Sequence, residues 1–144
     1  MSQAVEGCVI APFEMADYAE VLALWKRTEG MGLSAADSPE RIHQYLERNP
    51  GFSLTARLEG VLVGAALCGH DGRRGYLHHV AVSPEARGKG IGAILVRECL
   101  ARLRAAGIDK CHLFVYRDNE TGRSFWQRTG WRERVELVLM SKDI

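Results

Sequence analysis

Apolar and polar positions follow two periods along this chain, and each period predicts one class of secondary structure. Short apolar runs that end at turn residues predict strands over residues 8–13, 53–58, 61–68, 76–82, 110–116 and 131–140. Apolar residues at helical spacing predict four helices, which follow Asp17, Ser38, Gly92 and Asn119. This order predicts an α/β fold in a single domain over residues 1–144: a mixed, mostly antiparallel sheet of about six to seven strands with about four helices on its two faces.

Capping and turn residues mark the boundaries of these elements. Ser38-Pro39-Glu40 is typical of a helix start, with a capping residue, a proline in the first turn and an acidic residue. Glu59-Gly60, between two predicted strands, is typical of a two-residue hairpin. Gly107 ends the longest predicted helix. Residues 28–37 are rich in glycine and small side chains, which predicts a loop.

Composition limits the partners and the compartment. The chain has 144 residues and a formal charge of +1, so a core can form without metals, and the charge predicts neither a nucleic acid nor a membrane partner. Its four cysteines have no metal-binding spacing and lie mostly in apolar runs, which predicts reduced core residues. The sequence shows no secretory leader and no apolar run of ~20 residues. We therefore expect a cytoplasmic protein that is a monomer or a homodimer.

The most informative segment is VAVSPEARGKGIG, residues 80–92. Pro84 ends an apolar strand, and a turn with three glycines then opens the longest helix. The N–H groups at a helix start have no acceptor inside the helix and lie at the positive end of its dipole, which suits a phosphate. Arg87 and Lys89 add positive charge. The segment therefore predicts a cradle for a phosphate or pyrophosphate.

Two other phosphate-binding motifs do not fit this segment. A Walker A loop needs Ser or Thr after its Gly-Lys pair, whereas Lys89 precedes Gly90 here. The dinucleotide fingerprint needs GxGxxG between parallel strands and an acidic ribose partner about 20 residues further on. Here the glycines read GxGxG, and Gly107-Ile108 stands at that distance. Taken alone, the glycines also fit a tight turn without any ligand.

Two motifs together resemble the GNAT superfamily of N-acetyltransferases. Arg87-x-x-Gly90-x-Gly92, after Val80-Ala81-Val82, is similar to the family's acetyl-CoA pyrophosphate motif. Asn119, followed by Ser124-Phe125-Trp126 and Gly130-Trp131, is similar to the family's N-x4-A-x-Y-x3-G-F signature. The resemblance covers nearly the whole chain. It implies the acyl-CoA N-acyltransferase fold, with a sheet splayed at its middle and acetyl-CoA as cosubstrate.

The resemblance also implies which residues bind acetyl-CoA. Backbone N–H groups of the glycine turn hold the pyrophosphate, and main-chain groups of the preceding strand hold the pantetheine arm as an added strand would. For that, the strand that carries Val82 must separate from residues 111–116. The second motif contacts the pantetheine or the chain near it. The implied residues are Val80, Ala81, Val82, Arg87, Gly88, Lys89, Gly90, Ile91, Gly92, Asn119, Ser124, Phe125 and Trp126.

Acetyl transfer to an amine needs a base that takes the ammonium proton. We expect His78 to be this base. A strand with His at this position resembles that of the arylalkylamine acetyltransferases, in which this His serves in proton removal. Period-two alternation places His78 on the face of Tyr76 and Val80, with His79 on the other face and packed against a helix. The alternative for His78 is a hydrogen-bonded side chain that lines the cleft without a proton role.

The departing thiolate needs a proton or a stabilising contact. The Tyr that many relatives use as this acid is replaced here by Trp126, whose indole N–H cannot serve as a proton-transfer acid. Tyr116 is the candidate substitute, and an unaided thiolate departure is the alternative. Tyr116 also fits a simpler role as an aromatic wall of the pocket.

The expected acceptor is a small-molecule or peptide amine. Glu29 and Asp37, in the loop over residues 28–37, and Asp71 are candidate contacts for a cationic amine. The simpler alternative is a solvated Glu29 and an Asp37 that caps or precedes the second helix. The histidine and cysteine spacing matches no zinc pattern, so we expect no metal. Two further function classes stay open: a catalytically silent acetyl-CoA sensor and a generic phosphate-binding domain.

Overall fold

The computed structural model describes residues 5–144, which divide into two compact units, residues 5–114 and 115–144. The first four residues of the domain predicted over residues 1–144 lie outside this described part. The first unit contains a sheet and three α-helices, and the second contains one α-helix. The single-domain organisation stays a prediction.

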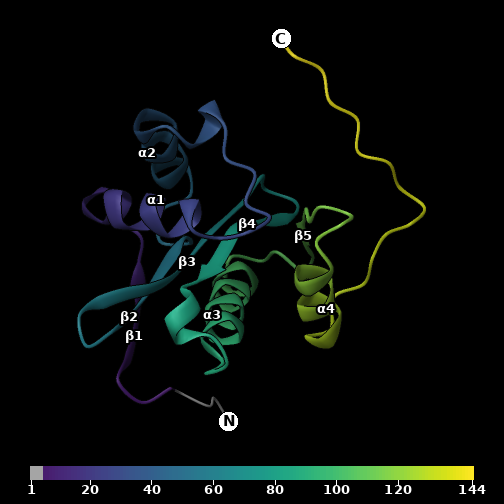
Figure 1. The fold of residues 1–144 in the computed structure, drawn as a ribbon. Helices are drawn as coiled ribbons and strands as arrows, with labels where there is room; N and C mark the ends of the chain where they lie inside the picture. Colours follow the sequence, from purple (N-terminus) through teal and green to yellow (C-terminus); the bar gives the residue numbers. More distant parts are fainter. Residues whose placement is uncertain (1–4) are drawn as a thin grey trace. The chain divides into compact units, whose positions relative to one another are not determined.

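The first unit is built on a five-stranded sheet whose strands lie side by side in chain order (Figure 1). Neighbouring strands are antiparallel except for the last two, which are parallel. The strands are β1 Cys8–Pro12, β2 Leu54–Leu58, β3 Val61–His70, β4 Gly75–Val82 and β5 Cys111–Leu113. The hairpin predicted at Glu59-Gly60 is confirmed, since both residues have the positive φ values, 49° and 80°, that this tight turn needs.

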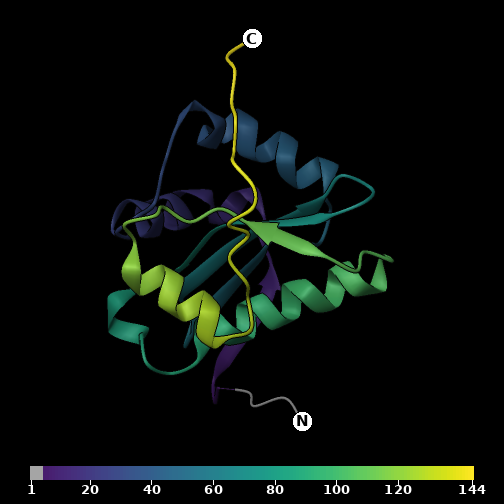
Figure 2. The same cartoon turned by 90° about the vertical axis from the view of Figure 1, so that its right-hand side faces the viewer.

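Two helices cover one face of this sheet and a third covers the other (Figures 1 and 2). The helices are α1 Tyr18–Lys26, α2 Pro39–Arg48 and α3 Ile91–Ala105. On the first face, α1 and α2 enclose a core of buried apolar residues: Phe13, Val21, Leu24, Trp25, Ile42, Leu62, Ala65, Leu67 and Ala81. On the second face, Gly64 lets α3 approach closely, because an added Cβ would lie 2.9 Å from Leu95 Cδ1.

The residue before a helix makes a capping hydrogen bond at α2 but not at α1. Ser38 caps α2 as predicted, since its Oγ accepts the N–H of Arg41 at 3.3 Å. Asp17 stands at the N-cap position of α1 but makes no capping hydrogen bond there. Its carboxylate instead accepts the N–H of Glu14 at 3.0 Å and binds Arg57.

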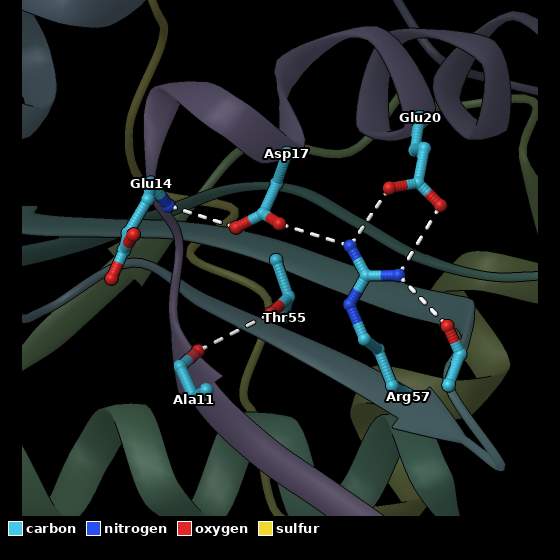
Figure 3. A network of polar contacts seen from close by, with 7 residues as sticks. Ala11, Glu14, Asp17, Glu20, Thr55 and Arg57 are labelled. Atoms are coloured by element: carbon cyan, nitrogen blue, oxygen red, sulfur yellow. Dashed lines mark hydrogen bonds and ion pairs between the residues drawn. The ribbon is translucent and has the colours of Figure 1, made fainter.

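Arg57 on β2 joins the start of α1 to the sheet (Figure 3). Its Nη2 lies 2.9 Å from Asp17 Oδ1 and 2.8 Å from Glu20 Oε1, and its Nη1 donates to the carbonyl of Gly60 at 3.1 Å. The hydrogen bond from Arg57 holds the pKa of Glu20 below its ordinary value. Because one guanidinium binds two carboxylates of the first helical turns, the network fixes α1 against the sheet.

The second unit contains α4, Glu120–Arg128, and the segment that follows it. The strand predicted over residues 131–140 is absent, so the described residues form five strands and not the predicted six to seven. A strand needs a neighbour for its backbone N–H and C=O groups, and no strand is described between residues 115 and 144. The segment after α4 is in contact with that helix through a salt bridge, in which Arg123 Nε lies 2.8 Å from Glu133 Oε2.

Candidate functional site

The centre of the candidate site is a break in β4. Between its paired positions Leu67↔His78 and Ala65↔Ala81, two residues of β4 stand opposite the single residue Ala66 of β3. This is a β-bulge, and its first residue, His79, has a left-handed φ of 51°. A non-glycine residue in this conformation costs on the order of 1 kcal/mol, so surrounding contacts must hold it.

The bulge changes which side chains share a face of the sheet. Residues paired across antiparallel strands lie on one face, so His78 shares its face with Ala81 and not with Val80 as predicted. His79 also lies on the α1 side, where its ring meets Trp25 at 4.9 Å between centroids. The prediction that His79 points to the opposite face is therefore wrong, while its packing against a helix is confirmed. The extra residue in β4 explains both differences.

Two hydrogen-bonded contacts on the α1 side hold His79, and two more hold its partner Asp37. Its Nε2 lies 2.9 Å from Asp37 Oδ1, and its carbonyl accepts the indole N–H of Trp25 at 3.0 Å. Asp37 Oδ2 accepts the N–H of Ser34 at 3.0 Å, and Tyr18 donates its hydroxyl proton to the Asp37 carbonyl at 2.6 Å. Asp37 is 8% exposed. These contacts hold the loop between α1 and α2 against the bulge.

His78 lies among aromatic rings directly before the bulge. The ring of Tyr45, from α2, meets it edge-on at 6.2 Å, and the rings of Tyr76 and Phe114 lie nearly parallel to it at 6.3 Å. Burial lowers the pKa of His78, and the neighbouring His79 lowers it further. A lowered pKa keeps His78 neutral at moderately acid pH, which is the state in which an imidazole can accept a proton.

Pairing between β4 and β5 ends just before the bulge, at Leu77↔Leu113. Strand β5 is shorter than the predicted 110–116, and within the first unit no described strand pairs with residues 78–82 on that side of β4. The Val82 carbonyl accepts the Nε–H of Arg87 at 3.3 Å, so this predicted pair of cofactor residues is in contact. The edge required for an added strand is thus present within this unit.

The glycine turn for which the sequence predicts a phosphate cradle lies at the start of α3. Gly90 is the N-cap residue, with a left-handed φ of 82° and no side chain to cap the helix. A Cβ at Gly88 or Gly90 would meet no atom within 4 Å, so both face open space. The amides of the first helical turn have no acceptor inside the helix, and Gly90 brings no carboxylate or hydroxyl to them. Open space beside unsatisfied donors fits a pyrophosphate.

The acidic residues predicted to bind the acceptor differ in their contacts. Asp71 lies exposed in the β3–β4 turn, where its Oδ1 accepts the N–H groups of Arg73 and Arg74 at 2.8 Å each. These bonds lower the pKa of the Asp71 carboxyl. Asp37 is bound to His79 and Ser34, as described above. Glu29 lies exposed on the loop that follows α1.

The remaining predicted residues belong to the second unit. The Asn119 side chain caps α4, where its Oδ1 accepts the N–H of Gly122 at 3.0 Å. Ser124 accepts a hydrogen bond from Arg128 at 3.2 Å, and the rings of Phe125 and Trp126 meet at 4.9 Å. The carbonyl of Tyr116 accepts the N–H of Asn119. Their roles toward acetyl-CoA or the thiolate stay predictions.

The sequence interpretation missed Tyr45 and Phe114 as neighbours of His78. Tyr45 follows Ile42 at helical spacing on α2, which is the signal of a residue that faces the sheet. Phe114 follows His112 by two residues, and the register Tyr76↔His112 places both on the face of His78. The missing information was the parallel register of β4 and β5, which no local pattern contains.

Residues 5–144 contain neither a candidate membrane span nor a candidate metal site. No helix in this described part is long and apolar enough to cross a membrane. No group of three or more His, Cys, Asp or Glu side chains there could hold a metal ion.

Comparison with known proteins points to one family. The profile of the acetyltransferase (GNAT) family matches residues 18–131. An acetyltransferase of Pectobacterium atrosepticum is 31% identical over 133 residues, 92% of each chain, and one of Photorhabdus laumondii is 32% identical over 136 residues, 94% of each. The fold is similar to that of the PaiA N-acetyltransferase from Thermoplasma acidophilum in complex with coenzyme A, with a TM-score of 0.75, 22% identity and 87% and 89% of the two chains covered.

A first prediction tests the cradle with two matched glycines at opposite ends of α3. Gly90 and Gly107 have φ values of 82° and 86°, and a Cβ at either would meet nothing within 4 Å. Gly90→Asp and Gly107→Asp therefore introduce the same charge at similar backbone conformations. We expect acetyl-CoA to raise the melting temperature of the wild type and of Gly107→Asp, but not that of Gly90→Asp. An undiminished shift in Gly90→Asp would place the phosphates elsewhere.

A second prediction tests the contacts that hold the bulge. Asp37→Ala leaves the N–H of Ser34 and the ring of His79 without their acceptor in a buried site. We expect the free energy of unfolding in urea to fall by about 2–4 kcal/mol. Asp71→Ala is the matched control, because it also removes a carboxylate that accepts two N–H groups, but an exposed one. Equal losses in the two variants would show that Asp37 does not hold the bulge.

Proposed function

Because the chain belongs to the acetyltransferase (GNAT) family, we propose that it transfers the acetyl group of acetyl-CoA to a primary amine by direct attack in a ternary complex. The observation that carries this proposal is the continuity of β4 with α3. His78 precedes the bulge, an unpaired strand edge follows it, and the open helix start of Gly90 comes next. A proton acceptor and an anion cradle thus stand on one continuous segment.

Bound acetyl-CoA supplies a thioester carbonyl that an uncharged amine can attack. We assign the amides of residues 88–92 to the pyrophosphate and the free edge of residues 80–82 to the pantetheine arm. The guanidinium of Arg87, already at the Val82 carbonyl, is placed to add positive charge beside the cradle. Asn119, Ser124, Phe125 and Trp126 complete the proposed acetyl-CoA contacts by the family pattern.

His78 is the proposed base. It takes the proton that the amine nitrogen loses, directly or through one water, while the new carbon–nitrogen bond forms and the carbon–sulfur bond breaks. Tyr116 is the proposed donor of a proton to the departing thiolate, with solvent as the alternative. Glu29 is our choice for an acidic contact with the amine, since Asp37 and Asp71 already use their carboxylates within the protein.

Trp126 supports a second candidate function, a catalytically silent acetyl-CoA sensor, because the indole cannot replace the usual acid. An acetylation screen over a panel of primary amines, with release of free thiol as the readout, separates the two. Turnover on any amine supports the enzyme. Binding of acetyl-CoA without turnover on the whole panel supports the sensor.

A third prediction concerns His78→Gln, which removes the imidazole but keeps a polar side chain of similar size. Turnover should fall by roughly 10²-fold or more, the usual range for a positioned base, while acetyl-CoA still binds. In the wild type, the rate per uncharged amine should decline only below the ordinary His pKa of about 6.5, because the His78 pKa is lowered. This decline of the rate at acid pH, the acid limb of the pH profile, should be absent from the variant.

His43→Gln is the control, since this histidine lies on the exposed side of α2 with 56% of its side chain accessible. It should keep both the rate and the acid limb. If His78→Gln also keeps both, the base is another group. If acetyl-CoA affinity collapses together with the rate, His78 supports the cofactor site structurally and the proton role has no support.

A further inference from the structure

The segment after α4 exposes a run of apolar side chains. Glu133 is bound to α4 through Arg123, and the Leu137 N–H then donates to the Arg134 carbonyl at 3.2 Å, which closes a turn. Beyond this turn the trace is extended (Figure 1) and forms neither a helix nor a strand. Four apolar residues in it have 60–88% of their surface exposed: Leu137, Val138, Leu139 and Met140. Consecutive residues of an extended chain point to opposite sides, so the segment is apolar on both faces.

An extended apolar segment is stabilised by pairing with another strand, which satisfies its backbone N–H and C=O groups. Between residues 115 and 144 the structure describes no strand that could be this partner. A second copy of the chain brings the same segment. Whether two copies can pair then depends on which charges the pairing places opposite each other.

We propose that residues 136–142 of two copies pair as antiparallel strands across a twofold axis at Leu139. The interface is isologous, because each copy contributes the same segment. The axis stands perpendicular to the strand pair, so it keeps every side chain on its own face. Residues directly opposite each other in an antiparallel pair share a face, and this condition is met only when the axis passes through a residue and not between two.

Opposite charges meet in this register. Glu136 lies opposite the partner's Lys142, and Val138 lies opposite the partner's Met140, on one face of the strand pair. The axis repeats each pair, so two ion pairs flank an apolar centre, and both kinds of pair favour association. Within its own chain Glu136 binds Arg134 at 2.9 Å, but 54% of the Glu136 side chain stays exposed and can meet a partner.

The neighbouring symmetric registers are less favourable. An axis at Val138 places Arg134 opposite the partner's Lys142, so that like charges meet. An axis at Met140 places Lys142 opposite the partner's Val138, which sets a charge against an apolar side chain. Charge complementarity therefore selects the axis at Leu139.

Sedimentation equilibrium of the full chain, at concentrations up to about 0.5 mM, tests this interface without acetyl-CoA or an amine. We expect the average mass to rise from that of one chain toward that of two. Glu136→Lys or Lys142→Glu places like charges opposite each other twice, so each should raise the dissociation constant of the dimer about 10-fold or more. The double variant Glu136→Lys/Lys142→Glu restores opposite charges and should return the constant to within about 3-fold of the wild type.

Lys110→Glu is the matched control, because it makes the same change in net charge at an exposed lysine of the first unit. It should leave the dissociation constant unchanged. Leu139→Lys sets two ammonium groups against each other at the axis and should leave the chain monomeric.

A monomer at every concentration would overturn the inference. So would a dimer whose dissociation constant is unchanged by the charge reversals and by Leu139→Lys, or a double variant that associates no better than the single ones. Because no measurement uses acetyl-CoA, these outcomes are independent of the proposed acetyl transfer.

Discussion

The left-handed backbone of His79 is the constraint on which the site depends. It inserts one extra residue into β4 opposite β3, and the paired positions of β4 and β5 end just before it, at Leu77↔Leu113. This conformation is unfavourable for a histidine, and the contacts of Asp37 and Trp25 oppose that cost. Asp37 in turn fixes the loop between α1 and α2. The contacts at this distortion therefore hold the strand and the loop together, and the distortion places Ala81, not Val80, on the face of His78.

The parts of β4 before and after the bulge have different neighbours. Before it, Tyr76 and His78 stand beside Phe114 on the α2 side. After it, the strand runs into the turn that opens α3 at Gly90, where unsatisfied amides favour an anion. The proposed base and the proposed cradle thus lie on one strand and the helix start that follows it.

Local patterns predicted much of the fold, because they report interactions between residues that are near in sequence. Ser38 and Glu59-Gly60 were identified by capping and turn chemistry that needs only neighbouring residues. The Asp37–His79 pair was not predicted because its two residues are 42 positions apart. The bulge was not predicted because it depends on how β4 pairs with β3. Simple alternation assigned the wrong face to His79 for the same reason. The strand predicted over residues 131–140 has the required apolar residues, but a strand forms only where another strand can pair with it.

We propose that the free edge of β4 and the start of α3 together bind acetyl-CoA. Amide hydrogen exchange, resolved by residue with and without saturating acetyl-CoA, tests it most directly. We expect exchange to slow at residues 88–92, where helix-start amides gain phosphate acceptors, and at residues 80–82, where the strand edge gains a partner. Slower exchange confined to other parts of the chain, with both segments unchanged at saturation, would contradict it.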